Sequence, residues 1–385
     1  MKPAPLAQRV STLELFFDLV FVFTITQLTA VLRVEPTPLV ALQVLLMLAI
    51  IFWMYGGYVW LTNAVSADRA SRRLVLLAGM AGFFIVALTV PNAFDGGGLA
   101  FGLAYAVVIA VHIGLFSRAS RVRSILGVLR LGRFNALIAV AVIVGGAVGG
   151  VIQLAVWSVV VLLAWLVVPR ISPGSFDIGA AHFVERHGLV VIVAIGESVV
   201  ALGLGLRDLP VGPGLIAVAL LGLALSACLW WAYFGGDDQR AEEALMAAPP
   251  ARRSMLAIQS YGYAHLALLL GIIAIAAAVE EIAHHPADVL DIGLAVALGA
   301  GGALYLGGQA GFRRVLTIGT PIPRLLAAVV CLATVPLGSA LAAAAQLGAL
   351  LAIFLALFAL ESLRARSRER IQEGRSEPRL SRGAG

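Results

Sequence analysis

The chain alternates between long stretches without a charged residue and short charged segments. About 20 consecutive apolar residues cross the ~30 Å hydrocarbon core of a bilayer, so stretches of this length are typical of membrane-spanning helices. One stretch, at residues 11–32, is interrupted only by Glu14 and Asp18, and another, at 189–206, only by Glu197. Six charge-free stretches each predict one further helix: residues 36–67, 74–94, 96–117, 209–236, 254–279 and 292–312.

Two other apolar stretches, residues 134–169 and 325–360, are too long for one crossing. Each has 36 residues and would extend ~54 Å as a single helix. We therefore expect each to be a hairpin of two helices. The sequence GGAVGG at 145–150 is the candidate bend in the first, while PLGS at 336–339 and QLG at 346–348 are candidates in the second. The predicted total is twelve spanning helices.

The arginine and lysine residues test this count, because basic residues collect in cytoplasmic loops. With twelve crossings, 25 of the 27 basic residues fall on one side, and only Arg33 and Arg207 fall on the other. We therefore expect both ends of the chain to be cytoplasmic and the protein to lie in the plasma membrane. The apolar start of the chain is too long for a cleavable signal peptide, so we expect the first helix to be retained.

Composition supports the same class of protein. Hydrophobic residues make up 61% of the 385 residues, charged residues only 12%, and the mean hydropathy is +0.99. Soluble globular domains carry about 25% charged residues, so we expect an all-α, polytopic transmembrane helical bundle whose partner is the lipid bilayer. The isoelectric point near 9.8 follows from the cytoplasmic loops, and we expect no nucleic-acid partner. The basic tail at 364–385 is expected to be disordered and to touch anionic lipid.

Metal and cofactor sites have weak signals. Cys228 and Cys331 lie in apolar stretches and predict packing rather than a disulfide framework. The segment EEIAHHPADVLD at 280–291 places each of two glutamates four residues before a histidine, a spacing that could hold a divalent metal. We interpret it as a solvated helix end, and we expect no metal and no cofactor.

Features repeat along the chain at nearly constant offsets. Arg133 and Arg324 precede the two hairpins and are 191 residues apart. The sequence WMYGG at 53–57 and the sequence WAYFGG at 231–236 are each followed by a pair of arginines. The two tryptophans that begin these sequences are 178 residues apart, and the two arginine pairs are 180 residues apart. Because each half then has six helices, the repeat is parallel, with a pseudo-two-fold axis along the membrane normal.

This duplication predicts the domain organisation. We expect a cytoplasmic segment at 1–10, a first six-helix half at 11–170, a second at 171–363 and the tail at 364–385. The helix at residues 12–32 then corresponds to the helix at 185–206, and both are predicted to lie near the axis between the halves.

The charged residues of these two helices are the candidates for chemistry. Glu14 and Asp18 share one helix face at a spacing of four residues. In a structural interpretation they pair with Arg186, His187 or loop arginines at the cytoplasmic rim and tie the halves together. In a functional interpretation they line an ion or substrate path between the halves.

Glu197 lies 12 residues, or ~18 Å, beyond Glu185, which places it near the middle of the membrane. It is interpreted either as a protonated carboxyl bonded to a serine, threonine or carbonyl group, or as a proton or cation site. In the second case Glu185 and His187 belong to the same path, and His187 can titrate near neutral pH. An acid–base pair of Glu185 and His187 is the alternative for an intramembrane enzyme.

The stretches ELFFDLVFV at 14–22 and ERHGLVVIVAIGES at 185–198 resemble the bacterial low temperature requirement A family of integral membrane proteins. The likeness covers residues 13–360. The family's name refers to poor growth in the cold without the protein and implies no chemical role for a residue. The motif positions that correspond are Glu14, Phe17, Asp18, Glu185, Arg186, His187, Gly188, Gly196, Glu197 and Ser198.

Twelve helices in two parallel halves resemble the general plan of secondary transporters, an analogy of fold only. The leading hypothesis is therefore a proton- or cation-coupled transporter of a small solute rather than an enzyme, with no catalytic residue. The alternative is a non-transporting membrane factor for cold or envelope adaptation that acts through lipids or protein partners.

Overall fold

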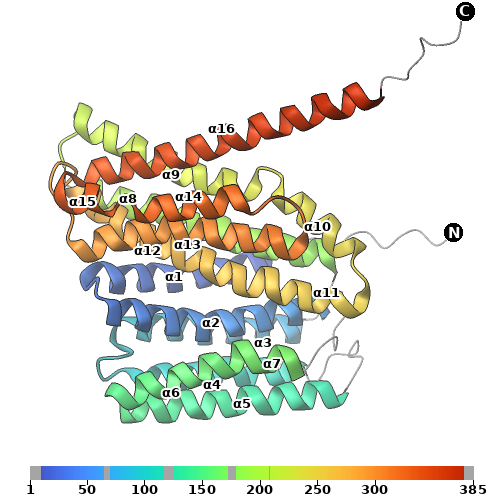
Figure 1. Cartoon of the computed structure of the whole chain (residues 1–385). Coiled ribbons are helices and arrows are strands. Elements are labelled where there is room, and N and C mark those ends of the chain that lie inside the picture. The colour runs from blue at the N-terminus through green and yellow to red at the C-terminus, as the bar shows by residue number, and fades with distance from the viewer. Residues whose placement is uncertain (1–9, 65–69, 117–124, 172–178, 208, 377–385) are drawn as a thin grey trace, which may run out of the picture.

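The chain folds into a bundle of long helices that lie side by side (Figure 1). The computed structural model describes residues 10–64, 70–116, 125–171, 179–207 and 209–376. The first half contains α1 (Thr12–Val34), α2 (Pro38–Ala64), α3 (Ala70–Thr89), η1 (Val90–Asn92), α4 (Gly98–Phe116), α5 (Ile125–Val148), α6 (Gly150–Leu162), η2 (Leu163–Val167) and α7 (Val168–Ile171). The second contains α8 (Ala180–Leu206), α9 (Pro213–Phe234), α10 (Asp237–Ala247), α11 (Pro250–Ala257), η3 (Ile258–Ala264), α12 (His265–His284), α13 (Ile292–Leu316), α14 (Ile322–Leu332), α15 (Val335–Ala340) and α16 (Ala343–Ser376).

Twelve segments of the described chain are long and apolar enough to cross a bilayer. The predicted number of spanning helices and the all-α class are therefore confirmed. Helical structure is required in these segments because hydrocarbon offers no partner for a backbone N–H or C=O group. Several spans extend past the apolar stretches that predicted them, among them Pro213–Ala247 and Arg252–His284.

The first hairpin turns where the glycine-rich sequence predicts. Gly149 separates α5 from α6 and Gly150 begins α6, with φ angles of +76° and +59°. L-residues with side chains rarely adopt such angles, whereas glycine does so at little cost. The bend at GGAVGG is confirmed.

The second hairpin turns at residues 341–342, which neither candidate bend predicted. Pro336 lies in the first turn of α15, where its missing N–H needs no partner, so it begins a short helix instead of ending one. Gln346 lies inside α16, and its Nε2 donates a hydrogen bond to Ala295 O. A Cβ atom on Gly338 would overlap Gln346 Oε1, so the two candidate segments face each other across the hairpin, and the bend lies between them.

The helices of the two halves pack in the same order. α1 contacts α3, which contacts α4, followed by α5 and α6; in the second half α8 contacts α12, which contacts α13, followed by α14 and α16. The halves meet where α1 packs on both α8 and α12. This order agrees with the predicted duplication, but the duplication and its domain boundaries both stay predictions. The span that contains α12 is the most buried of the twelve, because 72% of its most apolar segment is buried. This span therefore forms the centre of the bundle.

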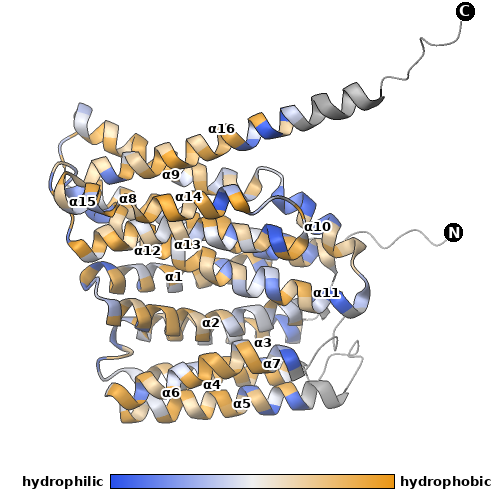
Figure 2. Cartoon of the chain, in the orientation of Figure 1, coloured by the Kyte–Doolittle hydropathy of each residue, from blue (hydrophilic) through white to orange (hydrophobic). Residues whose placement is uncertain are grey.

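Hydrophilic residues gather at one end of the bundle, around α10, α11 and the charged part of α16 (Figure 2). The start of α1 lies at the same end (Figure 1). Because α1 begins at the end of the bundle that carries the charged part of α16, the number of crossings between them is even. Which side of a membrane this end faces stays a prediction. The tail expected to be disordered at 364–385 is instead helical as far as Ser376, where α16 ends, and its residues 377–385 lie outside the described residues.

Candidate functional site

Glu14 is fixed at the start of α1 by a capping box. The backbone N–H and the hydroxyl group of Ser11 each donate to Glu14 Oε2 at 2.8 Å, and the Glu14 N–H donates to Ser11 Oγ. The second carboxylate oxygen, Oε1, lies 3.0 Å from Nε2 of His182 on α8. The local sequence therefore holds Glu14 over the first turn of α1, where it faces the second half of the chain.

Asp18 lies one turn further along the same face of α1 and is 1% exposed. Its Oδ2 accepts a hydrogen bond from Arg186 Nη1 on α8 at 2.9 Å, and its Oδ1 accepts one from the Tyr55 hydroxyl on α2, also at 2.9 Å. A buried ion pair is stable only when further hydrogen bonds satisfy the remaining lone pairs. Tyr55, which the sequence analysis did not single out, supplies one of them.

Arg186 is completely buried between α1, α2 and α8. Its Nη1 also donates to the backbone oxygen of Glu14 at 2.6 Å. The guanidinium carbon lies 5.8 Å from the ring centroid of Phe17 and 5.9 Å from that of Tyr55, within the range of cation–π attraction. These contacts agree with the structural interpretation of Glu14 and Asp18, because they join the first helix of each half.

His187 lies away from both acidic residues of α1. It is 2% exposed, and its Nδ1 is 2.9 Å from Phe183 O, so Nδ1 carries the hydrogen that this carbonyl accepts. Its ring contacts the rings of Tyr261 and His265, with centroids 4.8 and 5.5 Å away. The rim pairing that we considered for His187 is made by His182 instead.

Glu185 is exposed and accepts a hydrogen bond from the Val10 N–H at 3.3 Å. Residues two apart on a helix do not face each other. Glu185 and the buried His187 therefore point in different directions, and the acid–base pair considered for an enzyme is not assembled.

Glu197 is buried, at 4% exposure, where α8 packs on α1. The Thr26 hydroxyl lies 2.6 Å from Glu197 Oε2 and 3.3 Å from the backbone oxygen of Val22. Among the described residues Glu197 forms no ion pair within 4 Å. Its partner is a neutral hydroxyl group from the other half of the chain.

A polar column continues from Glu197 toward the far end of α1. Arg33 Nε lies 3.2 Å from Glu280 Oε1 on α12, and both side chains are partly exposed. Glu280 is also within electrostatic reach of Glu197. Thr29 lies between Thr26 and Arg33 on α1, is 1% exposed, and its hydroxyl has no hydrogen-bond partner in the described structure. The pair of Arg33 and Glu280 could not be predicted from the sequence, because it depends on α12 packing against α1.

The remaining motif residues surround this contact. A Cβ atom on Gly188 would lie 3.4 Å from the Phe234 ring, so the position permits close packing of α8 on α9. A Cβ on Gly196 would meet open space. Ser198 is 1% exposed, and its hydroxyl has no hydrogen-bond partner in the part of the chain that the structure describes.

A second buried charge network, in the second half, was missed by the sequence analysis. Asp237 Oδ2 lies 2.7 Å from Arg313 Nε and 3.0 Å from Arg324 Nη1. Both arginines also contact the carboxylate of Glu361, and Arg240 pairs with Asp237. Spacing along the sequence does not reveal this network, because its residues come together only through helix packing.

His284 and His285, at the end of α12, form no cluster with chelating geometry among the residues that the structure describes. His285 Nδ1 lies 3.5 Å from Asp288 Oδ2, and both side chains are more than half exposed. Within the described ranges, no group of three or more histidine, cysteine, aspartate and glutamate side chains could hold a metal ion. The geometry agrees with a solvated helix end.

Comparisons with known proteins connect this arrangement to one family. Residues 9–359 match the family described as bacterial low temperature requirement A protein. An uncharacterized protein of Rhizobium meliloti (strain 1021) is 27% identical over 315 residues, which cover 78% of this chain and 76% of that protein. No solved structure matches the chain. The match includes α1, α8 and every residue of the Glu14, Asp18, Arg186 and Glu197 contacts, and the chain belongs to the bacterial low temperature requirement A family.

Proposed function

We propose that the protein is a secondary transporter that couples the movement of a small solute to protons, with the Glu197 carboxyl group as the proton-binding site. The observation that carries this proposal is the position of Glu197, buried between the first helices of the two halves with a neutral hydroxyl as its partner. Ionisable residues inside a membrane are costly and commonly mark ion pathways. Two parallel halves that meet at such a residue fit the plan of several transporters, by analogy of fold.

The contacts of Thr26 favour reversible protonation. Its hydroxyl has one hydrogen and two acceptors within reach, Val22 O and Glu197 Oε2. With an ionised Glu197 the hydroxyl can donate fully to only one of them. A protonated Glu197 can donate to Thr26 Oγ1, which then donates to Val22 O, so both hydrogen bonds form. Proton binding therefore reverses one hydrogen bond between α1 and α8.

We favour a proton over a metal cation as the coupling ion. A buried metal cation needs a shell of several oxygen ligands, such as the six to eight around calcium. The described contacts of Glu197 supply its own carboxylate and the Thr26 hydroxyl. A proton needs only one carboxylate oxygen and a hydrogen-bond acceptor.

In this proposal the proton enters from the end of the bundle that carries Arg33 and Glu280. That ion pair is partly exposed, whereas Thr29 is buried between it and Thr26 and has a free hydroxyl that could relay a proton. A single, partly exposed ion pair contributes little stability. Separation of Arg33 from Glu280 would therefore open this end at small cost.

The opposite end is assigned a structural role. Asp18, Arg186 and Tyr55 are fully buried and bonded to one another. Breaking a buried ion pair is costly, so these residues would hold α1 against α8 while the other end opens. We therefore assign Glu14 and Asp18 to the connection between the halves and Glu197 to coupling.

The proposal includes a plasma-membrane location, cytoplasmic chain ends and no covalent catalysis. The one-sided distribution of basic residues supports the orientation. Glu185 and His187 point in different directions, which disfavours the enzyme hypothesis.

The test uses purified protein in liposomes that contain a pH-sensitive dye, with a library of small metabolites added outside. Three proteins are compared at equal reconstitution: wild type, Glu197→Gln and Glu185→Gln. The last is the matched control, because it removes an exposed carboxylate from the same helix. We expect a solute-dependent pH change with wild type and Glu185→Gln, and none with Glu197→Gln.

Two results would overturn the proposal. Equal proton movement by wild type and Glu197→Gln would remove Glu197 from the mechanism. If wild type restores growth in the cold but no solute in the library moves protons, the non-transporting membrane factor becomes the better hypothesis.

A further inference from the structure

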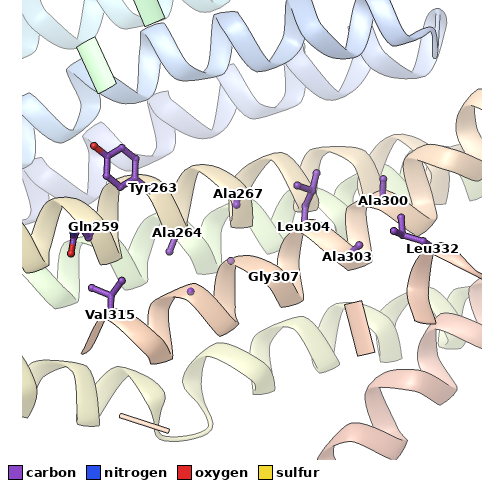
Figure 3. Close-up of a pocket in the computed structure, with 12 residues that line it drawn as sticks. Gln259, Tyr263, Ala264, Ala267, Ala300, Ala303, Leu304, Gly307, Val315 and Leu332 are labelled. Atoms are coloured by element: carbon purple, nitrogen blue, oxygen red, sulfur yellow. The ribbon is translucent and has the colours of Figure 1, made fainter. Parts of the chain in front are cut away.

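A groove of about 780 Å³ runs along an open surface of α12 and α13 (Figure 3). Most of the lining residues are alanine or glycine, among them Ala267, Ala303 and Gly307. Gln259 and Tyr263 of η3 lie together at one end. The groove is therefore apolar along its length and polar at one end.

The groove is long. Along α13 it is lined from Ala300 to Val315, a distance of ~22 Å at 1.5 Å per residue. One leaflet of the hydrocarbon core is ~15 Å thick, half of the bilayer value. A complete acyl chain therefore fits along the groove.

Of the three glycines that line the groove, Gly308 packs closely on Ala264 of η3, but Gly307 and Gly311 are not required by helix packing. A Cβ atom on Gly271 would lie 2.7 Å from Gly301 O, so glycine is needed at the contact between α12 and α13. A Cβ on Gly307 or Gly311, in contrast, would meet no atom within 4 Å. Glycine is among the least favourable residues in a helix. At these two positions its effect is to deepen the groove.

Positive charge lies at the polar end. Arg314 is exposed and follows Gly307 by seven residues and Gly311 by three, which places it on the same face of α13. Arg170 of α7 is also exposed and lies within electrostatic reach of the Tyr263 hydroxyl. An occupant with an apolar chain and an anionic head matches both parts of the surface.

We propose that the groove binds one anionic glycerophospholipid, with its phosphate at Arg314 and Arg170 and one acyl chain along Gly307 and Gly311. Arginine is well suited to phosphate because its planar guanidinium donates two hydrogen bonds in parallel. Basic residues near the membrane surface also attract anionic lipid. A helix from a second copy of the chain would fill the apolar floor but would leave this charge unmatched. The proposal does not depend on transport by Glu197.

The experiment is native mass spectrometry of the purified full chain, exchanged into micelles with equal amounts of phosphatidylglycerol and phosphatidylcholine. We expect wild type to retain one phosphatidylglycerol. Gly307→Leu should retain less lipid of both kinds. In Arg314→Gln the ratio of retained phosphatidylglycerol to retained phosphatidylcholine should fall about fivefold. The controls are Gly348→Leu, whose Cβ also meets open space, on α16, and Arg364→Gln, an exposed arginine on the same helix. Both controls should behave as wild type.

Three results would overturn the proposal. They are unchanged lipid retention by monodisperse Gly307→Leu, equal effects of Arg314→Gln and Arg364→Gln, and a dimer that Gly307→Leu dissociates. The last result would assign the groove to a second copy of the chain. If Gly307→Leu is not monodisperse, the comparison of Arg314→Gln with Arg364→Gln decides, because both arginines are exposed and neither change alters the apolar floor.

Discussion

Replacement of Asp18 by alanine should destabilise the protein more than any change to a surface charge. The substitution removes a carboxylate that accepts hydrogen bonds from Arg186 and Tyr55. Arg186 is 0% exposed and would keep its charge without a carboxylate partner. Its remaining hydrogen bond to Glu14 O goes to a carbonyl that already belongs to the helix.

The expected loss of unfolding free energy is about 3–5 kcal/mol, the cost of leaving one partner of a buried ion pair uncompensated. Tyr55→Phe removes one hydrogen bond to a charged group and should cost less, about 1.5–3 kcal/mol. The double variant Asp18→Leu with Arg186→Met removes both charges and should recover most of the stability lost in Asp18→Ala, since apolar replacements of a buried ion pair are often neutral or stabilising.

The assay is the fraction of detergent-purified protein that stays monodisperse after heating, measured over a temperature series. Arg364→Gln, an exposed charge on α16, is the control and should stay within about 0.5 kcal/mol of wild type. If Asp18→Ala were as stable as this control, or if the double variant were less stable than Asp18→Ala, the assignment of this cluster as the connection between the halves would be wrong.

Three further predictions concern other parts of the fold. Gly149→Ala should lower stability by about 1 kcal/mol or more because φ is +76°. Gly348→Ala, inside α16, should raise stability by about 0.5–1 kcal/mol. Denaturation in detergent should show that the two variants differ from wild type in opposite directions. Glu361→Gln should cost about 1–3 kcal/mol, because two buried arginines lose a carboxylate partner, and equal stability to wild type would remove this network from the stabilising contacts. Reporter fusions should read external at Asp288 and cytoplasmic at Gly385, and an external reading at Gly385 would refute the even number of crossings.

The spanning helices were predictable because the bilayer constrains each of them separately. A backbone in hydrocarbon must be helical and its side chains apolar, so each charge-free stretch reports its own crossing. The contact between α1 and α8 was also within reach of the sequence. Glu14 and Asp18 lie on one helix face, and the duplication placed Arg186 on the corresponding helix of the other half.

The partners across helices were not predictable in the same way. Tyr55 meets Asp18 and Glu280 meets Arg33 only because α2 and α12 pack where they do, and neither the spacing nor the composition of those helices specifies a partner. The same holds for Asp237 and Glu361, which are brought to the same two arginines from α10 and α16. Charge-free stretches identify helices, but a polar contact depends on the packing of two or more of them.

The contact between Asp18 and Arg186 also has a consequence for biosynthesis. The two residues are 168 positions apart, and a ribosome that adds 5–20 residues per second needs about 10–30 s to make that length. During this interval the first helix has a carboxyl group without its guanidinium partner, and an ionised carboxylate in lipid is costly. The carboxyl must therefore bind a proton or stay beside water or the insertion machinery. A nascent chain that stalls before the seventh span would lack the partner of Asp18 and would expose an unpaired first half to proteases.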